Sequence, residues 1–288
     1  MASSIHLLKP YRSPHKLIRI GADQDGSYLI PDDLKNIKAC FSPGVANRKD
    51  FEDILARKYR IQSYMCDFSS DLMKFKTDLI KNMQFFDKKW LDINDGVNNI
   101  SLENWVNKYI SNPSDDLMLQ MDIEGAEYRN LLSTSETLLN RFRILVIELH
   151  EIYPLVLGIK GNEVELLLKK LNQNHICVHA HPNNCCGEII DQSTGMNIPS
   201  VIELTFLRKD RFFNTNLLVS SEIPHPKDIS ANVLTKRPLH LNKKWFHPKK
   251  RRVISLVKII KDNLIWFLFS LYVKFPIKNL ILKFLRLR

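Results

Sequence analysis

The chain lacks the features of a secreted, disulfide-stabilised protein. Its 288 residues include only five cysteines, an odd number without the spacing of a disulfide framework. Residues 1–10 contain no continuous apolar stretch as long as that of a signal peptide. We therefore expect a cytoplasmic protein in a reducing environment. With 44% hydrophobic residues, the chain can bury a full core as one large domain with an appendage.

Acidic residues are almost missing from the carboxyl-terminal segment, residues 243–288. This segment holds 13 Lys and Arg against a single acid, Asp262, and carries a charge of +12. The rest of the chain has 29 basic and 30 acidic residues, so its charge is −1 although the whole chain stands at +11. A neutral globular part without interleaved basic and aromatic residues argues against nucleic acid as a partner. A terminal block of like charge is typical of an interaction segment.

Long uninterrupted apolar runs are also missing from this segment. Its densest apolar stretch, 264–273, has ten residues, and three charged residues interrupt the longer run 253–273. A membrane-spanning helix needs about 20 mostly apolar residues, so spanning is not expected. Basic flanks with Trp266 and Tyr272 suit a helix on the surface of an anionic membrane. We expect residues 249–288 to bind the inner, cytoplasmic face reversibly; the alternative is a tail helix that docks on the catalytic domain or on a partner subunit.

The sequence does contain a predicted buried strand that ends in acids. The largely apolar run 117–121 is followed by Asp122 and Glu124, and a helical pattern then begins near Ala126. Such a run indicates a buried strand of a parallel sheet. Alternate side chains of a strand share a face, so we expect the two acids to point the same way. Open α/β sheets bind ligands at this edge, which makes both acids candidates for chemistry or for holding hydroxyl groups.

Glu124 and Glu127 also have a simpler interpretation, in which they only cap the following helix. Negative charge is favoured in the first helical turn, and Gly125 allows the chain to turn tightly before it. The sequence leaves both interpretations open.

The segment 122–127, Asp-Ile-Glu-Gly-Ala-Glu, resembles the core of the FkbM-type methyltransferases, together with the amphipathic helix after it and the strand 144–150. The resemblance extends over residues 17–208, and this acidic segment is its most specific part. Members of that family are S-adenosylmethionine-dependent enzymes of the class I, Rossmann-like fold. The resemblance implies S-adenosylmethionine as cofactor and, as methyl acceptor, a hydroxyl group on a sugar, glycan or glycolipid precursor.

The order of the predicted elements fits an α/β fold of this class. Five strands alternate with helices, and two strands then follow without a helix between them. This order resembles the seven-stranded, mostly parallel sheet of class I methyltransferases, in which the last strand is antiparallel. We expect an N-terminal hairpin segment (1–34), the methyltransferase domain (35–210), a linker (211–242) and a helical basic tail (243–288).

Local patterns predict several further elements. The Asp-Gly pair at 25–26 lies between apolar runs, a strong signal for a hairpin, which we interpret as a lid or edge over the cofactor end of the sheet. A helix is predicted over 72–83 and a short strand over 85–91. Ser101 is a good cap for the next helix. A single helix is expected over 126–138.

Three residues are candidates for binding the cofactor: Gly44, Asp67 and Asp122. Gly44 lies where a class I methyltransferase has its glycine-rich loop, although only this one glycine is present. Asp67 ends the next strand 23 residues later, where an acid of a Rossmann-like sheet accepts hydrogen bonds from ribose hydroxyls. Alternatively, Asp67 caps a helix that begins at Ser70.

The candidate catalytic bases are Asp122, His150 and His181, each at the predicted carboxyl end of a strand. Methyl transfer from a sulfonium requires a hydroxyl oxygen held close to the methyl group and a group that removes its proton. Histidine has a suitable pKa, whereas a carboxylate needs a raised one. The sequence does not choose between the three.

Four further residues are candidates for orienting the acceptor: Glu124, Glu148, Asn183 and Asn184. The last two belong to the segment 179–187, His-Ala-His-Pro-Asn-Asn-Cys-Cys-Gly, whose histidines and cysteines also suggest zinc. The spacing fits no common zinc pattern, and adjacent cysteines rarely bind one tetrahedral metal, so no metal is expected.

The main alternative for the whole chain is a non-catalytic, membrane-tethered binding or scaffold module of the same fold, whose weak glycine loop no longer holds cofactor.

Overall fold

The computed structural model describes residues 4–22, 25–156, 159, 161–191, 195–213, 217–220, 223–229 and 231–245. The segment 249–288, for which we predict membrane binding, lies outside the described residues. Within them, no helix is long and apolar enough to cross a lipid bilayer.

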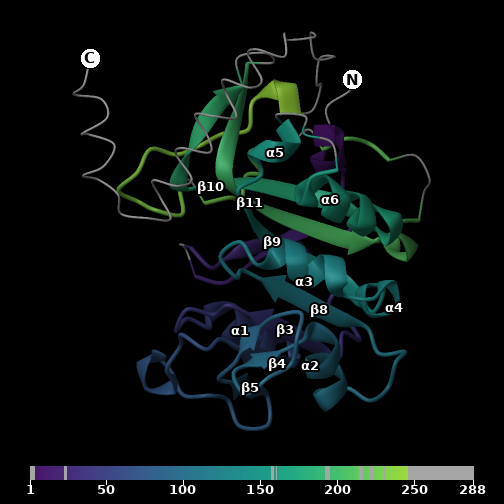
Figure 1. Cartoon of the computed structure of the whole chain (residues 1–288), viewed down its shortest axis with the longest axis vertical. Coiled ribbons are helices and arrows are strands. Elements are labelled where there is room, and N and C mark those ends of the chain that lie inside the picture. The colour runs from purple at the N-terminus through teal and green to yellow at the C-terminus, as the bar shows by residue number, and fades with distance from the viewer. Residues whose placement is uncertain are drawn as a thin grey trace, which may run out of the picture. The chain divides into compact units, whose positions relative to one another are not determined.

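The described residues form an α/β fold around a seven-stranded sheet (Figure 1). The strand order is β10-β11-β9-β8-β3-β4-β5. β11 runs antiparallel to both of its neighbours, and the other neighbouring strands are parallel. The strands are β3 (Ala39–Pro43), β4 (Gln62–Cys66), β5 (Gln84–Asp87), β8 (Leu117–Met121), β9 (Phe142–His150), β10 (His175–Asp191) and β11 (Met196–Arg208). This confirms the predicted seven-stranded, mostly parallel sheet with its last strand antiparallel.

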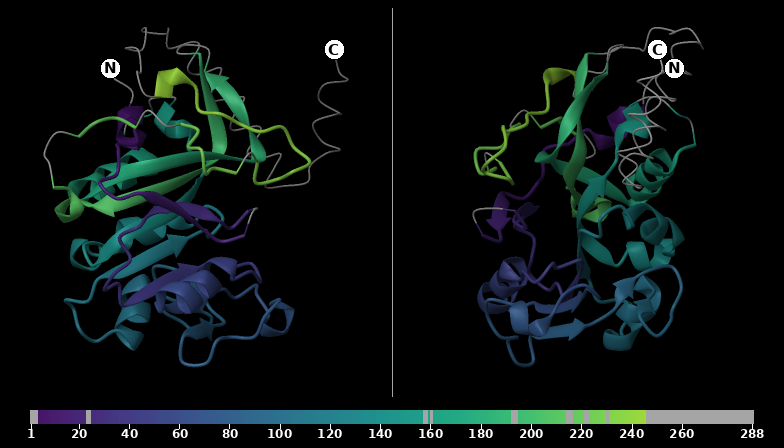
Figure 2. Two further views of the ribbon diagram at one scale, coloured as in Figure 1. Left: turned by 180° about the vertical axis from the view of Figure 1, so that it is seen from behind. Right: turned by 60° about the vertical axis from the view of Figure 1, so that its left-hand side comes forward.

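Helices and a hairpin cover the two faces of the sheet (Figure 2). One face packs against α2 (Leu102–Tyr109), α3 (Glu127–Ser133), α4 (Glu136–Leu139), α5 (Tyr153–Val156) and α6 (Glu163–Asn174). The other face packs against α1 (Asp50–Ile54), the π-helical turn Leu55–Tyr59 and the hairpin of β1 (Leu17–Ile20) and β2 (Tyr28–Pro31). A separate two-stranded sheet joins β6 (Trp90–Leu91) to β7 (Asn99–Ile100).

The central strand β9 serves two separate cores because its side chains alternate between the faces. Leu145 and Ile147 belong to the core under α3 and α6. Ile144 and Val146 belong to the core under the hairpin and α1. Glu148 continues this second series, so its carboxylate lies on the hairpin side of the sheet, where it is 4% exposed.

The β1–β2 hairpin confirms the turn predicted at residues 25–26. The two strands are antiparallel, with Ile20 paired to Tyr28. The Thr205 hydroxyl on β11 donates a hydrogen bond of 2.7 Å to the carbonyl of Leu29, which fixes β2 to the sheet. Tyr28 is 3% exposed, and its hydroxyl accepts a hydrogen bond of 3.4 Å from the side-chain amide of Gln120 on β8, so the strand after the turn is anchored near the carboxyl end of β8.

The predicted helix over 72–83 is wrong. Only Leu72–Lys74 is helical, as a short 3₁₀ turn, and the chain then runs irregularly to β5. Side chains hold this segment from outside: the ammonium group of Lys49 donates to Thr77 at 2.7 Å and to Gln84 at 3.2 Å. These tertiary hydrogen bonds override a helical pattern that is weak in any case.

Two other expectations need correction. The strand predicted over 85–91 is divided between β5 and β6. The helix predicted over 126–138 is divided into α3 and α4, since Ser135 accepts a hydrogen bond from the Leu138 amide and starts a new helix. The cap predicted at Ser101 is confirmed, because its hydroxyl accepts from the Asn104 amide.

Gly44 determines how closely the loop after β3 approaches the end of β8. Its φ is +83°, and a Cβ atom at this position would lie 1.6 Å from the carbonyl oxygen of Asp122. The Gly44 amide donates to the Cys66 carbonyl at 2.9 Å, and the Asp122 amide donates to the Pro43 carbonyl at 3.3 Å. The ends of β3, β4 and β8 are thus fixed together by contacts that leave no space for a side chain.

We expect Gly44→Ala to lower the free energy of unfolding by more than its unfavourable φ alone explains. A positive φ costs a non-glycine residue about 1–3 kcal/mol, and the contact with the Asp122 carbonyl adds to this. The matched control is Gly161→Ala, because Gly161 has a φ of +68° and no heavy atom within 4 Å of the added Cβ. Urea unfolding of both variants measures the difference. Equal losses would contradict the close approach at Gly44.

Candidate functional site

Titratable side chains from β9, β10 and β11, and from the residue that follows β8, lie together beneath the β1–β2 hairpin. Glu203 on β11 is paired in register with Glu148 on β9 on one side and with His181 on β10 on the other. Asp122 directly follows β8, and His150 is the last residue of β9. Sheet pairing therefore places titratable groups side by side at the edge where α/β folds bind ligands.

Asp122 has the properties expected of a general base. Its Oδ1 atom is buried without a hydrogen-bond partner and lies 4.0 Å from Nε2 of His150. Burial raises the pKa of Asp122 to about 7. The carboxylates of Glu124, Glu127 and Asp25 act in the same direction, and His150 opposes them. An acid with this pKa can accept a proton near neutral pH.

His150 lies among carboxylates. Its Nδ1 is 3.2 Å from Oε1 of Glu127, and its Nε2 is 3.4 Å from Oε2 of Glu124. Burial lowers the pKa of His150, but the carboxylates of Glu127, Asp122 and Glu124 outweigh it, so the pKa lies above its ordinary value. The pKa values of Asp122 and His150 therefore depend on each other.

Glu127 and Glu124 have different surroundings. Glu127 is fully buried, and its Oε1 accepts hydrogen bonds from the amides of Ile123 (2.9 Å) and Gly125 (3.2 Å). It holds the loop and the His150 ring; because the amides that it binds precede α3, this role is structural but is not a cap of the helix. The Glu124 side chain, in a residue with a φ of +55°, is 88% exposed despite its contact with His150, so a ligand can reach it.

Asp67 is already occupied by hydrogen bonds within the protein. Its Oδ2 accepts from the Ala46 amide (2.9 Å) and the Ser70 hydroxyl (2.8 Å). Its Oδ1 accepts from the amide and hydroxyl of Ser69 and from the Ser70 amide. Burial raises the pKa of Asp67, but these hydrogen bonds outweigh it and lower the pKa overall. A carboxylate has about four lone-pair sites, so the contacts favour a structural role. The helix expected from Ser70 is not formed, and the short turn Leu72–Lys74 is capped by Asp71, so Asp67 holds a loop and caps no helix. A bond from Asp67 to ribose stays a prediction.

A narrow cleft lies over Asp122, between the hairpin turn and α1. Its lining includes Tyr28, Gly44, Glu52 and Gln120. The cleft volume is about 60 Å³, well below the roughly 300–1,000 Å³ of typical ligand pockets. Burial raises the pKa of Glu52 to about 7, and its Oε1 has no hydrogen-bond partner. A nucleoside cofactor would need this cleft to widen.

The predicted acceptor residues on β10 have separate roles. Asn183 donates to Oε1 of Glu148 at 2.8 Å and so lies within the buried acidic group. Asn184 donates to three backbone carbonyls between residues 233 and 237 and accepts from the Val233 amide. Asn184 therefore anchors that segment, whereas Glu148 and Asn183 stay candidates for binding an acceptor.

His181 makes its contacts away from Asp122. Its Nε2 lies 3.3 Å from Oδ1 of Asn232, and its Nδ1 lies 3.8 Å from Oδ2 of Asp228. Burial lowers the pKa of His181, but Asp228 and Glu203 raise it by more. The structure thus pairs His150 with Asp122 and gives His181 different neighbours.

Sequence reasoning missed the residues supplied by segment 211–242. We expected a linker there, yet Asp228 lies 2.9 Å from Nε2 of His179, and Asn232 donates to Oε1 of Glu203 at 2.5 Å. No local signal distinguishes these two residues from ordinary loop residues, because they belong to no strand or helix.

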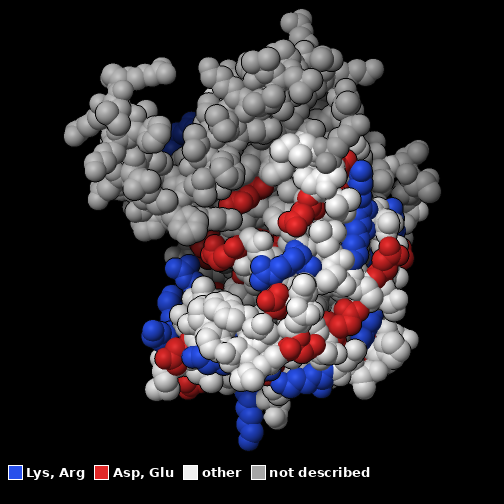
Figure 3. Space-filling view, in the orientation of Figure 1, with Lys and Arg blue, Asp and Glu red and all other residues white. Residues whose placement is uncertain are grey.

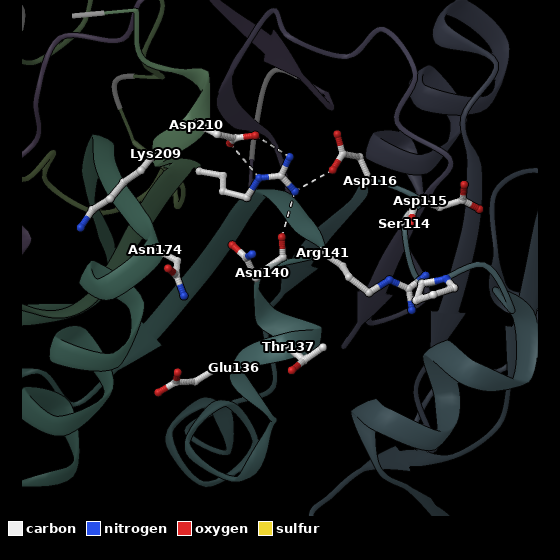
Figure 4. Close-up of a pocket in the computed structure, with 12 residues that line it drawn as sticks. Ser114, Asp115, Asp116, Glu136, Thr137, Asn140, Arg141, Asn174, Lys209 and Asp210 are labelled. Atoms are coloured by element: carbon white, nitrogen blue, oxygen red, sulfur yellow. Dashed lines mark hydrogen bonds and ion pairs between the residues drawn. The ribbon is translucent and has the colours of Figure 1, made fainter. Parts of the chain in front are cut away.

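A larger cavity, of about 770 Å³, opens at the other end of the sheet (Figure 4). It is lined by residues that precede β8 and β9 and follow β11, such as Asp116, Arg141 and Lys209. Two of its acids are neutralised within the protein, since Arg208 donates to Asp116 at 2.6 Å and to Asp210 at 2.8 Å. Ligands of open α/β sheets bind at the carboxyl ends of strands, so this cavity is the weaker candidate despite its size.

Comparisons with known proteins add little. No protein-family model matches the chain, and no curated protein matches it. Among solved structures, spermidine synthase from Thermotoga maritima is similar over 73% of this chain and 79% of its own, with 9% identity and a TM-score of 0.33. A likeness this weak carries no argument about function.

We expect Asp122→Asn to change how stability depends on pH. A carboxyl group whose pKa is raised in the folded protein destabilises it as the pH rises from about 4, the unfolded value, to about 7. The variant lacks this cost. It should be more stable than the parent at pH 8, by about 1–4 kcal/mol, and similar at pH 4. Urea unfolding at both values measures this, with the exposed Asp78 changed to Asn as control. A constant difference across pH would refute the raised pKa.

Proposed function

We propose that the protein is an S-adenosylmethionine-dependent O-methyltransferase of the FkbM type, acting on a hydroxyl group of a sugar, glycan or glycolipid precursor. The main support is Asp122, which has an unpaired buried oxygen, a pKa of about 7 and His150 beside it. Further support comes from the strand order, which resembles that of class I methyltransferases, with β3, β4 and β8 ending together at Gly44.

The residues fit part of a cofactor site. Gly44 lets the loop after β3 contact the Asp122 carbonyl, and both residues line the cleft. The unpaired Oδ1 of Asp122 suits a cationic group. Asp67 fits less well, because protein donors already occupy its oxygens. We therefore assign the cofactor to the Gly44 loop and Asp122.

When bound, the cofactor supplies a methyl group activated on a sulfonium. The protein's task is to hold the acceptor hydroxyl and take its proton. Asp122 accepts this proton, and the neighbouring imidazole of His150 stabilises the carboxylate beforehand. Glu127 holds the ring of His150, and the Tyr128 hydroxyl donates to the His150 carbonyl, so the imidazole beside the base is fixed by contacts from α3.

The second candidate function is a non-catalytic binding or scaffold module of the same fold. The narrow cleft over Asp122 and the occupied oxygens of Asp67 favour it. In that case the raised pKa of Asp122 would be a consequence of burial without a catalytic role.

Calorimetry with S-adenosylhomocysteine separates the two functions. We expect the full-length protein to bind one equivalent, and Asp122→Asn to weaken binding about tenfold, the effect of losing about 1.4 kcal/mol. If the folded protein releases no heat with up to 1 mM ligand, the methyltransferase proposal is refuted and the binding module is favoured.

Urea unfolding, together with the same calorimetry, decides the role of Asp67. Asp67→Asn replaces one of the two acceptor oxygens by a donor, which faces the Ala46 amide in one orientation of the side chain and the Ser69 amide in the other. We expect a loss of about 1–3 kcal/mol in the free energy of unfolding. Unchanged stability with ligand binding weakened tenfold to a hundredfold would assign Asp67 to the ribose instead.

We further propose that residues 249–288 attach the protein to an anionic membrane surface. Support comes from the charge pattern of this segment. The described residues show a different pattern, with Lys and Arg interspersed among Asp and Glu on the face in Figure 3. That mixed surface does not favour nucleic acid.

Vesicle sedimentation tests the attachment. We expect full-length protein to pellet with vesicles containing phosphatidylserine at low salt, and less at 0.5 M salt, because screening weakens exposed charges. Changing Lys249, Lys250, Arg251 and Arg252 together to Gln should reduce pelleting, since each base contributes about 1 kcal/mol near an anionic surface. If full-length protein stays in the supernatant with these vesicles at low salt, the segment instead contacts protein.

A further inference from the structure

Three carboxylates meet beneath the hairpin, next to the Asp122–His150 pair. Asp25 comes from the β1–β2 turn, Glu148 from β9 and Glu203 from β11. One oxygen of each lies within 4.8 Å of the other two. Glu148 and Glu203 are 4% and 5% exposed. The group is therefore assembled by the tertiary fold and largely removed from water.

No lysine or arginine compensates these charges among the described residues. Every such ion pair found there involves other acids. Burial and the neighbouring acids raise the pKa of Glu148, and burial raises that of Glu203 to about 7 although His181 opposes it. Like charges this close need bound protons or a cation.

Hydrogen bonds satisfy only part of the group. Asn183 donates to Glu148 Oε1 at 2.8 Å and to Asp25 at 3.4 Å. Asn232 donates to Glu203 Oε1 at 2.5 Å and to Asp25 at 3.1 Å. The second oxygen of Glu148, Oε2, is buried and has no hydrogen-bond partner. A buried carboxylate oxygen without a donor is costly, so this atom independently indicates a missing partner.

We propose that Asp25, Glu148 and Glu203 bind one divalent cation of the Mg²⁺, Mn²⁺ or Ca²⁺ class. The ligand atoms are all carboxylate oxygens, which hard cations prefer, and no thiolate takes part. A divalent charge neutralises the repulsion and gives Glu148 Oε2 a partner. The proposal does not depend on methyl transfer.

A second group with the potential to bind a metal, Asp122, Glu127 and His150, is a weaker candidate. Asp122 Oδ1 and Glu127 Oε2 also lack hydrogen-bond partners, but Glu127 Oε1 is already used by the amides of Ile123 and Gly125. A basic side chain, His150, is also present, so charge is partly balanced without a metal. Comparing cation binding by a variant in each group therefore shows which group holds the cation.

Manganese titration of full-length protein freed of metal with EDTA tests the proposal. We expect one equivalent of Mn²⁺ to bind. We also expect 1 mM Mn²⁺, Mg²⁺ or Ca²⁺ to raise the unfolding temperature. The rise should be about 5 °C when the cation concentration is a hundredfold above its Kd. Glu203→Gln should weaken Mn²⁺ binding at least tenfold. In EDTA its unfolding temperature should equal or exceed that of the parent, because one repelling charge is gone.

The controls make the outcome decisive. Asp25→Asn changes the ligand that lies outside the seven-stranded sheet and should also weaken binding at least tenfold, even if Glu203→Gln does not fold. His150→Gln should bind Mn²⁺ as the parent does. The proposal is overturned if the folded protein binds no Mn²⁺ at 1 mM, in which case the acids share protons. It is equally overturned if His150→Gln loses binding while Asp25→Asn keeps it.

Discussion

Burial of carboxyl groups at the carboxyl end of the sheet is the constraint on which the rest of this region depends. Each ionised group removed from water costs several kcal/mol unless it is paired, and Asp122, Glu148 and Glu203 lie together. Amides from Asn183 and Asn232 and neighbouring imidazoles offset part of the cost. The rest of this unfavourable free energy must be offset by apolar burial in the two cores elsewhere in the fold. Such local cost is typical of functional sites, where chemistry is favoured over stability.

The side chains of each strand alternate between the two faces of the sheet, and this alternation keeps the buried acids apart from the larger apolar core. On β9, Leu145 and Ile147 pack under the helices, while Ile144, Val146 and Glu148 face the hairpin. Substitution of Glu148 would thus leave the larger core, under the helices, undisturbed. Antiparallel β11 then extends the same row outward, since its register aligns Glu203 with Glu148.

Features carried by long, strongly patterned segments could be predicted from the sequence. The apolar run before Asp122 and the strand ending at His150 predicted the sheet and brought this pair to one edge, and the Asp-Gly pair predicted the hairpin. Features created by tertiary contacts could not be predicted. Asn232 lies in a segment without pattern, the oxygens of Asp67 are filled by loop hydroxyls and amides, and the helix expected over 72–83 is replaced by side-chain hydrogen bonds from Lys49.

The hydrogen bond between Asn232 and Asp25 joins residues 207 positions apart in the chain. Contacts of such long range form late in folding, because the loop between them must close first. The central parallel strands can assemble before either partner arrives. The acidic group is therefore completed only when both ends of the described chain are in place. By the same reasoning, a local opening that releases the hairpin turn dissolves the group while the sheet stays folded, so the lifetime of the site is shorter than the lifetime of the fold.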